Sequence, residues 1–246
     1  MKTDSPNKIK AFLLAAGLGT RLRPITDSIP KCLVPIGDKP LLGHWMESLI
    51  QAGVGEALVN THWLAGQVEA FAKGWNASTP VLTTFYEPEL LGSAGTIAAN
   101  AQWASDADAA LVIYADNFSR FDLRRLLGHH FATRSELTLG VFTAPDPRRC
   151  GIFEVDAEGR GLSFEEKPTE PKSNLAAAGL YVLSPDIVRE IKALWQPVQG
   201  VFDLGFDVFP QLVRRARVFP ITEPLIDIGT IEAYERVCRE YQTLNQ

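Results

Sequence analysis

A glycine-rich segment near the N-terminus combines residue types that bind phosphate. The sequence GLGTRL occupies residues 17–22, directly after the apolar run at residues 10–16. Glycines let backbone N–H groups come close to a phosphate, and the guanidinium of Arg21 offers two parallel hydrogen bonds to phosphate oxygens. We therefore predict a phosphate-binding loop. The alternative is a plain glycine turn with a solvated arginine.

Two familiar phosphate-binding loops do not match this segment. A dinucleotide fingerprint needs a third glycine where Leu22 stands, and a Walker A loop needs a Gly-Lys-Ser/Thr run, which the segment lacks. Pro24 and Pro30 turn the chain back, so that Lys31 can reach the same phosphates as Arg21 and add a second positive charge. Taken alone, Lys31 is more typical of a solvated surface lysine.

Asp116 fits a site for a hard cation. It stands just beyond the apolar run at residues 111–114, at an expected strand end beside the loop, where ligands bind in parallel sheets. A lone aspartate after a strand is more often a helix cap or a turn residue.

The GLGTRL loop followed by Pro30-Lys31 resembles the hallmark of the sugar-1-phosphate nucleotidyltransferase family. Further motifs follow in the order typical of that family, and the resemblance covers residues 10 to about 240. It is closest to the short guanylyltransferases that act on mannose-1-phosphate or heptose-1-phosphate. The motifs are PL at 40–41, LGSAG at 91–95, ADN at 115–117, EKP at 166–168, AGLY at 178–181 and DIGT at 227–230. Ala115 departs from the family's usual Gly-Asp pair by one methyl group.

The resemblance implies that the loop binds a nucleoside triphosphate. Arg21 and Lys31 then act as catalytic cations on the triphosphate. The segment at 91–95 also opens an expected helix, whose N–H groups suit phosphate, ribose or base contacts; a serine-capped helix start is the alternative. The implied nucleotide-binding residues are Ala15, Ala16, Gly17, Gly19, Thr20, Glu87, Gly92 and Ser93.

The resemblance also implies a metal and a sugar site. Asp116 and Asp227 would hold Mg²⁺, which requires two residues far apart in the sequence to meet in space. Lys167 would be a third catalytic cation, placed on the sugar phosphate. Without the resemblance, the EKP run reads as an exposed charged turn. The implied sugar-phosphate-binding residues are Asn117, Glu166, Lys167, Asn174 and Gly179.

Glu87 matches the family position that reads the nucleobase. An ionised carboxylate accepts hydrogen bonds and cannot donate them, so it suits the N–H groups of guanine, or the single N3–H of uracil or thymine. Adenine and cytosine would face it with an unprotonated ring nitrogen, at a cost of about 1–3 kcal/mol. The prediction is GTP first and UTP second.

The predicted reaction joins a nucleoside triphosphate to a sugar 1-phosphate and releases pyrophosphate. One alternative is a uridylyltransferase that acts on N-acetylmuramate-1-phosphate or glucose-1-phosphate. Another is transfer of a cytidylyl group to a phosphorylated alcohol, against which Glu87 and the EKP run speak. A third is a non-catalytic sensor of nucleotide sugars. The joint presence of Arg21, Lys31, Asp116 and the other charged residues of the motifs argues against a sensor.

The elements that must position these residues alternate between short apolar runs and helix-like stretches, which predicts an α/β fold. We expect a Rossmann-like, mixed but mostly parallel sheet flanked by helices. The resemblance implies that this fold is of the nucleotide-diphospho-sugar transferase type, with a small sugar-binding lobe. One domain, 1–246, would comprise a nucleotide-binding lobe (about 10–145) and a sugar-phosphate lobe with the C-terminal helix (about 146–246). The expected strands are 10–16, 57–60, 81–86, 109–114, 137–142, 152–155, 162–166 and 175–183, and the expected helices are 41–52, 64–73, 93–103, 123–133, 185–194, 206–215 and 231–244.

Composition bounds the remaining possibilities. A net charge of −5 without a block of like charges argues against binding to nucleic acid or to an anionic membrane. The three isolated cysteines and the absence of a signal peptide or apolar span from the sequence lead us to expect a cytoplasmic protein. One side of the expected last helix is apolar and would pack on the core or in a homodimer. We expect no room for an acetyltransferase domain after that helix.

Overall fold

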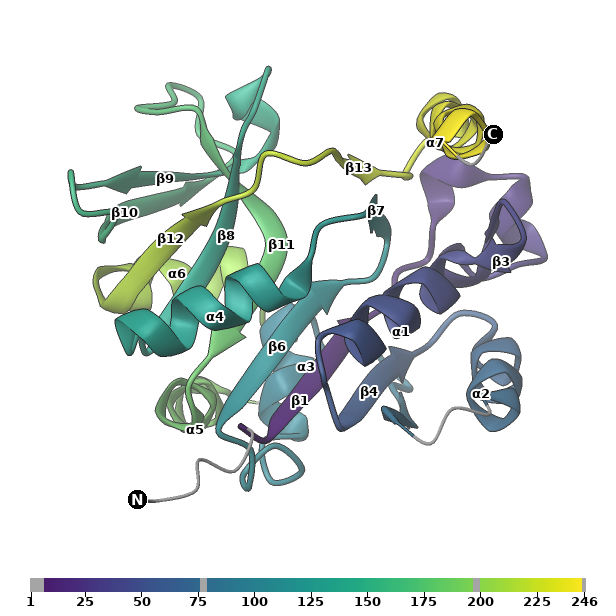
Figure 1. Cartoon of the computed structure of the whole chain (residues 1–246), viewed down its shortest axis with the longest axis horizontal. Coiled ribbons are helices and arrows are strands. Elements are labelled where there is room, and N and C mark those ends of the chain that lie inside the picture. Colours follow the sequence, from purple (N-terminus) through teal and green to yellow (C-terminus); the bar gives the residue numbers. More distant parts are fainter. Residues whose placement is uncertain (1–6, 76–78, 197–199, 245–246) are drawn as a thin grey trace.

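The computed structural model describes residues 7–75, 79–196 and 200–244. Within them, helices cover both faces of a nine-stranded sheet (Figure 1). The strands are β1 (Ile9–Leu14), β2 (Pro35–Ile36), β3 (Lys39–Pro40), β4 (Glu56–Thr61), β5 (Val81–Tyr86), β6 (Ala109–Tyr114), β7 (Asn117–Ser119), β8 (Leu137–Thr143), β9 (Gly151–Val155), β10 (Gly161–Glu166), β11 (Leu175–Leu183), β12 (Ala216–Pro220) and β13 (Leu225–Asp227). The α-helices are α1 (Leu41–Gln51), α2 (Ala65–Gly74), α3 (Ser93–Ala99), α4 (Leu123–Thr133), α5 (Pro185–Leu194), α6 (Phe209–Leu212) and α7 (Ile231–Leu244).

The predicted central strand is confirmed. β1 pairs in parallel with β4 on one side and with β6 on the other, and β5 pairs in parallel with β4. Ala11 and Leu13 belong to one hydrophobic core, whereas Phe12 belongs to the core on the opposite face. β1 is therefore apolar throughout because both of its faces are covered.

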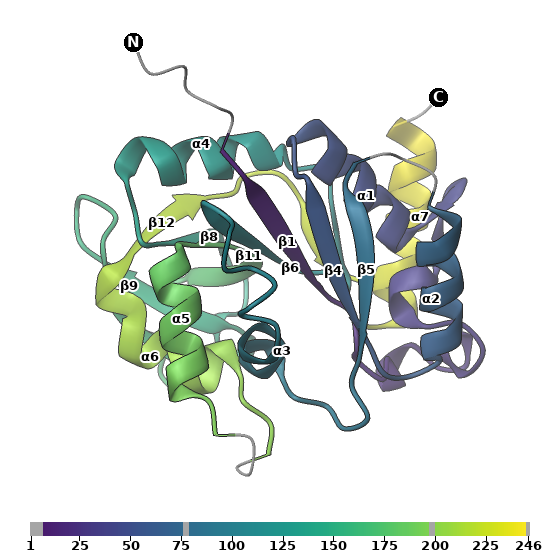
Figure 2. The same ribbon diagram turned by 90° about the horizontal axis from the view of Figure 1, so that it is seen from below.

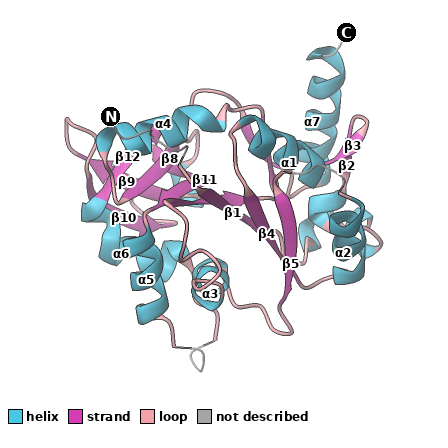
Figure 3. Ribbon diagram, turned by 60° about the horizontal axis from the view of Figure 1, so that its bottom comes forward, coloured by secondary structure: helices cyan, strands magenta, loops and turns pink. Residues whose placement is uncertain are grey.

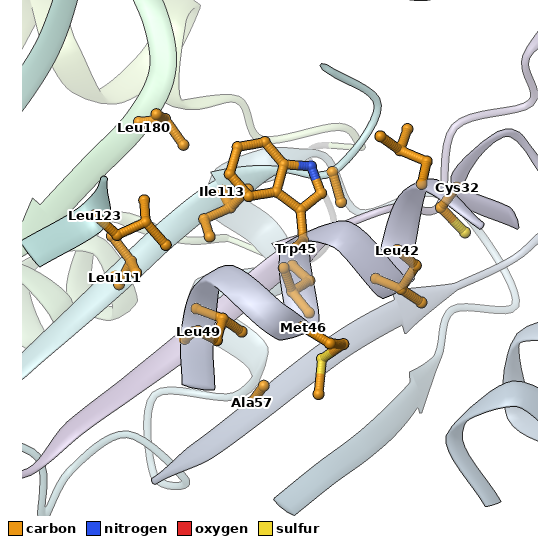
Figure 4. Packing of buried hydrophobic residues seen from close by; sticks show 14 of the residues in the cluster. Cys32, Leu42, Trp45, Met46, Leu49, Ala57, Leu111, Ile113, Leu123 and Leu180 are labelled. Carbon is orange, nitrogen blue, oxygen red and sulfur yellow. The ribbon is translucent and has the colours of Figure 1, made fainter. Parts of the chain in front are cut away.

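Figure 2 shows that α1 and α4 cover one face of the sheet, while α3 and α5 cover the other. Helix α1 follows the predicted periodicity and buries Trp45, Met46 and Leu49 against the sheet (Figure 4). The indole Nε1 of Trp45 donates a hydrogen bond of 2.8 Å to the carbonyl of Asn117. This bond fixes the chain directly after Asp116 to a rigid helix.

The second half of the chain continues the same sheet. The expected strands at 152–155 and 162–166 are β9 and β10, which form an antiparallel hairpin (Figure 3). β11 returns antiparallel to β6. The pairing of β11 with β8 shifts register between Ala177 and Tyr181, where Gly179 adopts a φ of 70°. This bulge brings Gly179 beside the end of β6. The division of the chain into two lobes stays a prediction.

Five strands were not predicted (β2, β3, β7, β12 and β13), and two of them, β7 and β13, carry the candidate site residues Asn117 and Asp227. β12 extends the sheet beside β8, and β13 pairs antiparallel with β7. In that ribbon Asp227 lies opposite Asn117. The short strand pair therefore brings the DIGT motif beside the ADN motif.

The predicted helix at 206–215 is wrong in its form and in its start. The segment is a wide π-turn (Leu204–Val208), the single turn α6, and a 3₁₀ turn (Val213–Arg215). Pro210 has no N–H to donate and its ring crowds the preceding turn, which explains the irregularity.

The expected helix at 93–103 also ends early, at Ala99. There the side chain of Asn100 donates to the carbonyl of Thr96.

The apolar side of α7 packs on its own chain. Val237 is fully buried in the core, and the hydroxyl of Tyr234 donates to the carbonyl of Pro35. Tyr241 stacks edge-on against His44. The homodimer stays a prediction. Among the helices of the described residues, none has the length and apolarity needed to cross a membrane.

Candidate active site

A cleft of about 520 Å³ opens at the carboxyl ends of β1, β4 and β6. This is the edge of a parallel sheet at which ligands bind. All the residues predicted to bind the nucleotide line it, together with Arg21, Lys31 and Asp116. Residues that were not predicted also line it: Leu14, Leu18, Cys32, Asn60, Leu90, Tyr114, Val201, Asp203 and Gly229.

The glycine loop is held in shape by its own backbone and by Asn60. Gly19 has a φ of 62°, and a Cβ there would lie 2.8 Å from a methyl group of Thr26. At the start of the loop, the N–H groups of Ala15 and Ala16 both donate to Asn60 Oδ1, at 2.6 and 3.2 Å. The loop is therefore preorganised on the end of β4.

The cations and carboxylates predicted from the sequence meet in one cluster. Lys31 Nζ lies 2.9 Å from Asp116 Oδ2 and 2.8 Å from Asp227 Oδ1, and Arg21 Nη2 lies 3.3 Å from Asp227 Oδ2. The Lys31 side chain is only 7 % exposed, whereas those of Asp116 and Asp227 are 42 and 48 % exposed. A buried ammonium group thus holds two partly exposed carboxylates, of which Asp116 lines the cleft.

The electrostatics of this cluster favour the ionised form of Asp227. Burial raises the pKa of Asp227, but the charges and hydrogen bonds of Lys31 and Arg21 outweigh burial and hold the pKa below its usual value. By contrast, burial raises the pKa of the nearby Cys32 thiol to about 12. Cys32 is therefore a packing residue and not a nucleophile at neutral pH.

Asp116 and Asp227 could hold Mg²⁺ only if a bound substrate and water supply the remaining oxygen ligands. Within the described ranges, no three His, Cys, Asp or Glu side chains are grouped so as to hold a metal. Mg²⁺ in phosphate-transferring sites is commonly held by one or two carboxylates, with substrate phosphates and water completing the shell. Two carboxylates at the mouth of a phosphate-binding cleft match that pattern.

Glu87 lies at the bottom of the cleft and is only 1 % exposed. Its Oε1 accepts hydrogen bonds from Asn60 Nδ2 at 2.9 Å and from Thr96 Oγ1 at 2.5 Å. Its Oε2 accepts from the N–H of Leu91 at 3.0 Å. Since a carboxylate offers about four acceptor positions, one position on Oε2 is left for a ligand.

At the start of α3, two of the N–H groups are already bonded within the protein. The N–H groups of Ala94 and Gly95 both donate to the carbonyl of Phe202, at 3.0 and 2.9 Å. A Cβ on Gly92 would lie 2.4 Å from that same oxygen, so only glycine fits there. The loop before Asp203 therefore takes up the N–H groups of Ala94 and Gly95. Gly92 and Ser93 line the cleft, and their binding of a nucleotide stays a prediction.

Asp203 ties this loop to α3. Its Oδ2 accepts a hydrogen bond of 2.7 Å from Ser93 Oγ, and its Oδ1 caps the π-turn by accepting from the N–H groups of Gly205 and Phe206. Ser93 was predicted to contact the nucleotide, and here its hydroxyl contacts Asp203. Ser93 and Asp203 together form one wall of the cleft.

The residues predicted to bind the sugar phosphate are only partly brought together. A Cβ on Gly179 would lie 3.1 Å from the amide nitrogen of Asn117, and Asn117 follows Asp116 directly. Glu166 and Asp203 both lie beside Gly205, where a Cβ would be 2.8 Å from Glu166 Oε2 and 3.2 Å from Asp203 Oδ1. Burial and the charge of Asp203 raise the pKa of Glu166, against the opposing effect of Lys167.

Lys167 and Asn174 lie farther out. Lys167 has a φ of 50° and an exposed side chain, with Nζ 3.9 Å from Glu166 Oε1. Asn174 is exposed before β11, and its carbonyl accepts from the N–H of Ala144. Neither is among the described residues that line the cleft.

Sequence reasoning missed Asn60, Tyr114 and Asp203. Asn60 and Tyr114 stand at the carboxyl ends of β4 and β6, where a polar side chain in an apolar strand is a usable signal. Asp203 had no such signal, because its partner Ser93 is distant in the sequence. Its role follows only from the folded chain.

The sequence and the structure were compared with those of known proteins. A model of the family described as nucleotidyl transferase matches residues 10–243. The chain is 31 % identical over 227 residues to the mannose-1-phosphate guanylyltransferase catalytic subunit beta of Drosophila melanogaster, covering 91 % of this chain and 60 % of that protein. It is also 31 % identical over 207 residues to the mannose-1-phosphate guanylyltransferase of Mycobacterium tuberculosis, and this match covers 84 % of this chain and 56 % of that protein. The chain thus spans about three fifths of the length of these relatives.

Solved structures agree with the fold. HddC from Yersinia pseudotuberculosis, 26 % identical, superimposes with a TM-score of 0.78 over 94 % of this chain and 99 % of that one, and its complex with GMP-PN gives 0.76. A UDP-glucose pyrophosphorylase complexed with UDP-glucose, 22 % identical, gives a TM-score of 0.81 over 96 and 99 %. The last likeness concerns the fold alone. On the match of its whole folded length to the family model, the chain belongs to the nucleotidyl transferase family.

Proposed function

We propose that this protein transfers a nucleotidyl group from a nucleoside triphosphate to a sugar 1-phosphate, giving a nucleotide sugar and pyrophosphate. The observation that carries the proposal is the cluster of Arg21, Lys31, Asp116 and Asp227 at the open end of the glycine loop. Cations and carboxylates from distant parts of the sequence converge there, beside a backbone preorganised for phosphate. The resemblance to mannose-1-phosphate guanylyltransferases supports GTP and mannose- or heptose-1-phosphate as the substrates.

The reaction needs little acid–base chemistry. A phosphate monoester has its second pKa near 6, so the attacking oxygen of the sugar phosphate is mostly ionised at neutral pH. A general base is then unnecessary, in keeping with the buried, protonated Cys32. The oxygen attacks the α-phosphorus and pyrophosphate leaves, with the bond to the leaving oxygen breaking in line.

The main obstacle is bringing two polyanions together, and charge neutralisation lowers it. We assign Arg21 and Lys31 to the triphosphate and Lys167, with Glu166, Asn117, Asn174 and Gly179, to the sugar phosphate. Asp116 and Asp227 would hold Mg²⁺, which when bound neutralises phosphate charge.

Glu87 bears on the choice of base. Its one open acceptor position on Oε2 can take a single N–H, whereas both donors of the guanine edge would need two positions. This specific observation favours a second candidate, a uridylyltransferase acting on N-acetylmuramate-1-phosphate or glucose-1-phosphate, in which uracil offers one N3–H. GTP stays our first assignment because the relatives above are guanylyltransferases.

The test is pyrophosphate release by the purified protein with Mg²⁺. GTP, UTP, dTTP, CTP and ATP are each paired with mannose-, heptose-, glucose- and N-acetylmuramate-1-phosphate, with Asp116→Asn as the control. Turnover of one pair that is lost in the control supports the proposal and names the substrates. Binding of nucleotide sugars without turnover of any pair would contradict it and favour a sensor.

The free cysteines of the described residues suit the cytoplasm, which we propose as the compartment.

A further inference from the structure

Lys31 occupies the space between the two carboxylates assigned to the metal. Its ammonium group contacts one oxygen of Asp116 and one of Asp227, at 2.9 and 2.8 Å. Arg21 contacts the other oxygen of Asp227 at 3.3 Å. Three of the four carboxylate oxygens therefore already face a cation of the protein.

The cluster also balances its own charge. Arg21 and Lys31 carry two positive charges, and Asp116 and Asp227 carry two negative ones. A divalent cation that approaches this group meets no net attraction, and it must compete with the Lys31 ammonium for the same oxygens. The carboxylates can act as strong metal ligands only after Lys31 has another partner.

A nucleoside triphosphate supplies that partner. Lys31 and Arg21 line the same cleft as the glycine loop, so phosphate oxygens bound there lie within reach of both cations. The Lys31 ammonium group can then exchange carboxylate oxygens for phosphate oxygens. This exchange frees Asp116 and Asp227 and adds negative charge to the cluster.

We propose that Lys31 excludes divalent metal from the nucleotide-free protein, and that triphosphate and metal bind with strong positive coupling because the triphosphate draws Lys31 away from Asp116 and Asp227. The inference rests on the proposed function, since it takes these two aspartates as the metal ligands. Lys31 thereby has two roles. It holds the empty cleft together, and it makes metal binding conditional on the nucleotide.

The experiment measures Mn²⁺ binding by electron paramagnetic resonance of the free ion, which requires no turnover. The whole protein is titrated without nucleotide, and then with GTP or UTP but no sugar phosphate, against a nucleotide-only reference. Lys31→Met and Lys31→Gln test the ammonium group. Lys10→Met is the matched control, because Lys10 is an equally buried lysine held by two carboxylates outside the cleft.

Without nucleotide, we expect both Lys31 variants to bind Mn²⁺ at least about tenfold more tightly than the wild type, since one repelling charge is removed at contact distance. Lys10→Met should match the wild type. With triphosphate, the affinity of the wild type should rise, whereas the affinity of the Lys31 variants should rise much less. Circular dichroism shows whether each variant is folded.

Two different failures are distinguishable. Equal Mn²⁺ affinity of the wild type and both folded Lys31 variants in the absence of nucleotide would overturn this inference and leave the proposed metal site intact. If Asp116→Asn and Asp227→Asn leave Mn²⁺ affinity unchanged with triphosphate present, the metal assignment in the proposed function fails as well.

Discussion

Two lysines of this protein have almost the same surroundings and, on our account, different tasks. Lys10 at the start of β1 is 6 % exposed and lies 3.1 Å from Glu56 and 2.8 Å from Asp106. Lys31 beyond the end of β1 is 7 % exposed and lies at similar distances from Asp116 and Asp227. Each is a buried ammonium group between two partly exposed carboxylates.

The difference lies in what else surrounds each ammonium group. Lys10 also donates to the carbonyl of Trp103 and lies 5.0 Å from the centre of that indole ring. Lys31 instead lines the cleft at the carboxyl ends of the parallel strands. The same ion-pair chemistry thus serves stability at one end of the sheet and ligand binding at the other.

The largest effect should come from the carboxylates of the cleft. Asp116→Asn or Asp227→Asn should lower the rate of pyrophosphate release about 10²- to 10³-fold, because each removes a charge that positions the metal and Lys31. The melting temperature should stay nearly unchanged, since both side chains are nearly half exposed. Kinetics and thermal unfolding of each variant check this. A loss of folding that parallels the loss of rate would assign these aspartates a structural role.

A smaller effect is expected at the wall of the cleft. Asn60→Asp keeps the acceptor for the N–H groups of Ala15 and Ala16 but sets a second carboxylate against Glu87. The KM for the triphosphate should rise about tenfold, the equivalent of one hydrogen bond, with a smaller change in kcat.

Asn100→Asp is the control, because that amide donates to a helix carbonyl outside the cleft lining. Steady-state kinetics with varied triphosphate separate KM from kcat. An equal rise of KM in both variants would mean that the Asn60 contacts do not shape the nucleotide site.

A substitution at the opposite end of the sheet should change the stability of the protein and not its activity. Lys10→Met loses the hydrogen bond to Trp103 and both ion pairs, and should lower the free energy of unfolding by about 1–2 kcal/mol. The kcat/KM for pyrophosphate release should stay within about twofold of the wild type. Chemical denaturation and kinetics measure the two quantities. A large loss of activity in the folded variant would remove the distinction between the two lysines.

The pH dependence should give the smallest effect. Burial lowers the pKa of Lys10, but its hydrogen bonds to Asp106 and Glu56 outweigh burial and raise the pKa above 10.5. Its contribution to stability is therefore present below pH 10.5 and is lost as the pH rises through the raised pKa. Hydrogen bonds from Lys10 and Lys8 lower the pKa of Asp106 below 3.8, so that contribution is lost as the pH falls through the lowered value.

The stability difference between the wild type and Lys10→Met should therefore be constant near neutral pH and shrink at both extremes. Denaturant unfolding across the pH range checks this. A difference that vanishes already near neutral pH would contradict the assignment of these ion pairs.

Much of the fold could be predicted because local pattern and burial agree. The strands β1, β4 and β6 are recognisable as short apolar runs because both of their faces are buried, and α1 is recognisable by its amphipathic period. The short pair β7 and β13 could not be predicted, since three-residue strands carry no period and depend on a distant partner. The π-turn at Leu204–Val208 departs from the helix predicted there because Pro210 has no N–H to donate and crowds the preceding turn.

The candidate site divides in the same way. Arg21, Lys31, Asp116 and Asp227 belong to recognisable motifs, and the structure brings them together. The hydrogen bonds of Glu87 to Asn60 and Thr96 depend on tertiary packing, which a motif does not contain. Sequence could suggest Glu87 as a ligand for the base but could not show how many of its acceptor positions the protein already uses.

The most direct measurement compares Lys31→Met and Lys10→Met for pyrophosphate release with the substrate pair that the wild type uses. The account predicts that kcat/KM falls about 10²- to 10³-fold in Lys31→Met and stays near the wild-type value in Lys10→Met, with both variants folded. Equal activity of the two variants would contradict the account, because Lys31 would then be a structural lysine like Lys10.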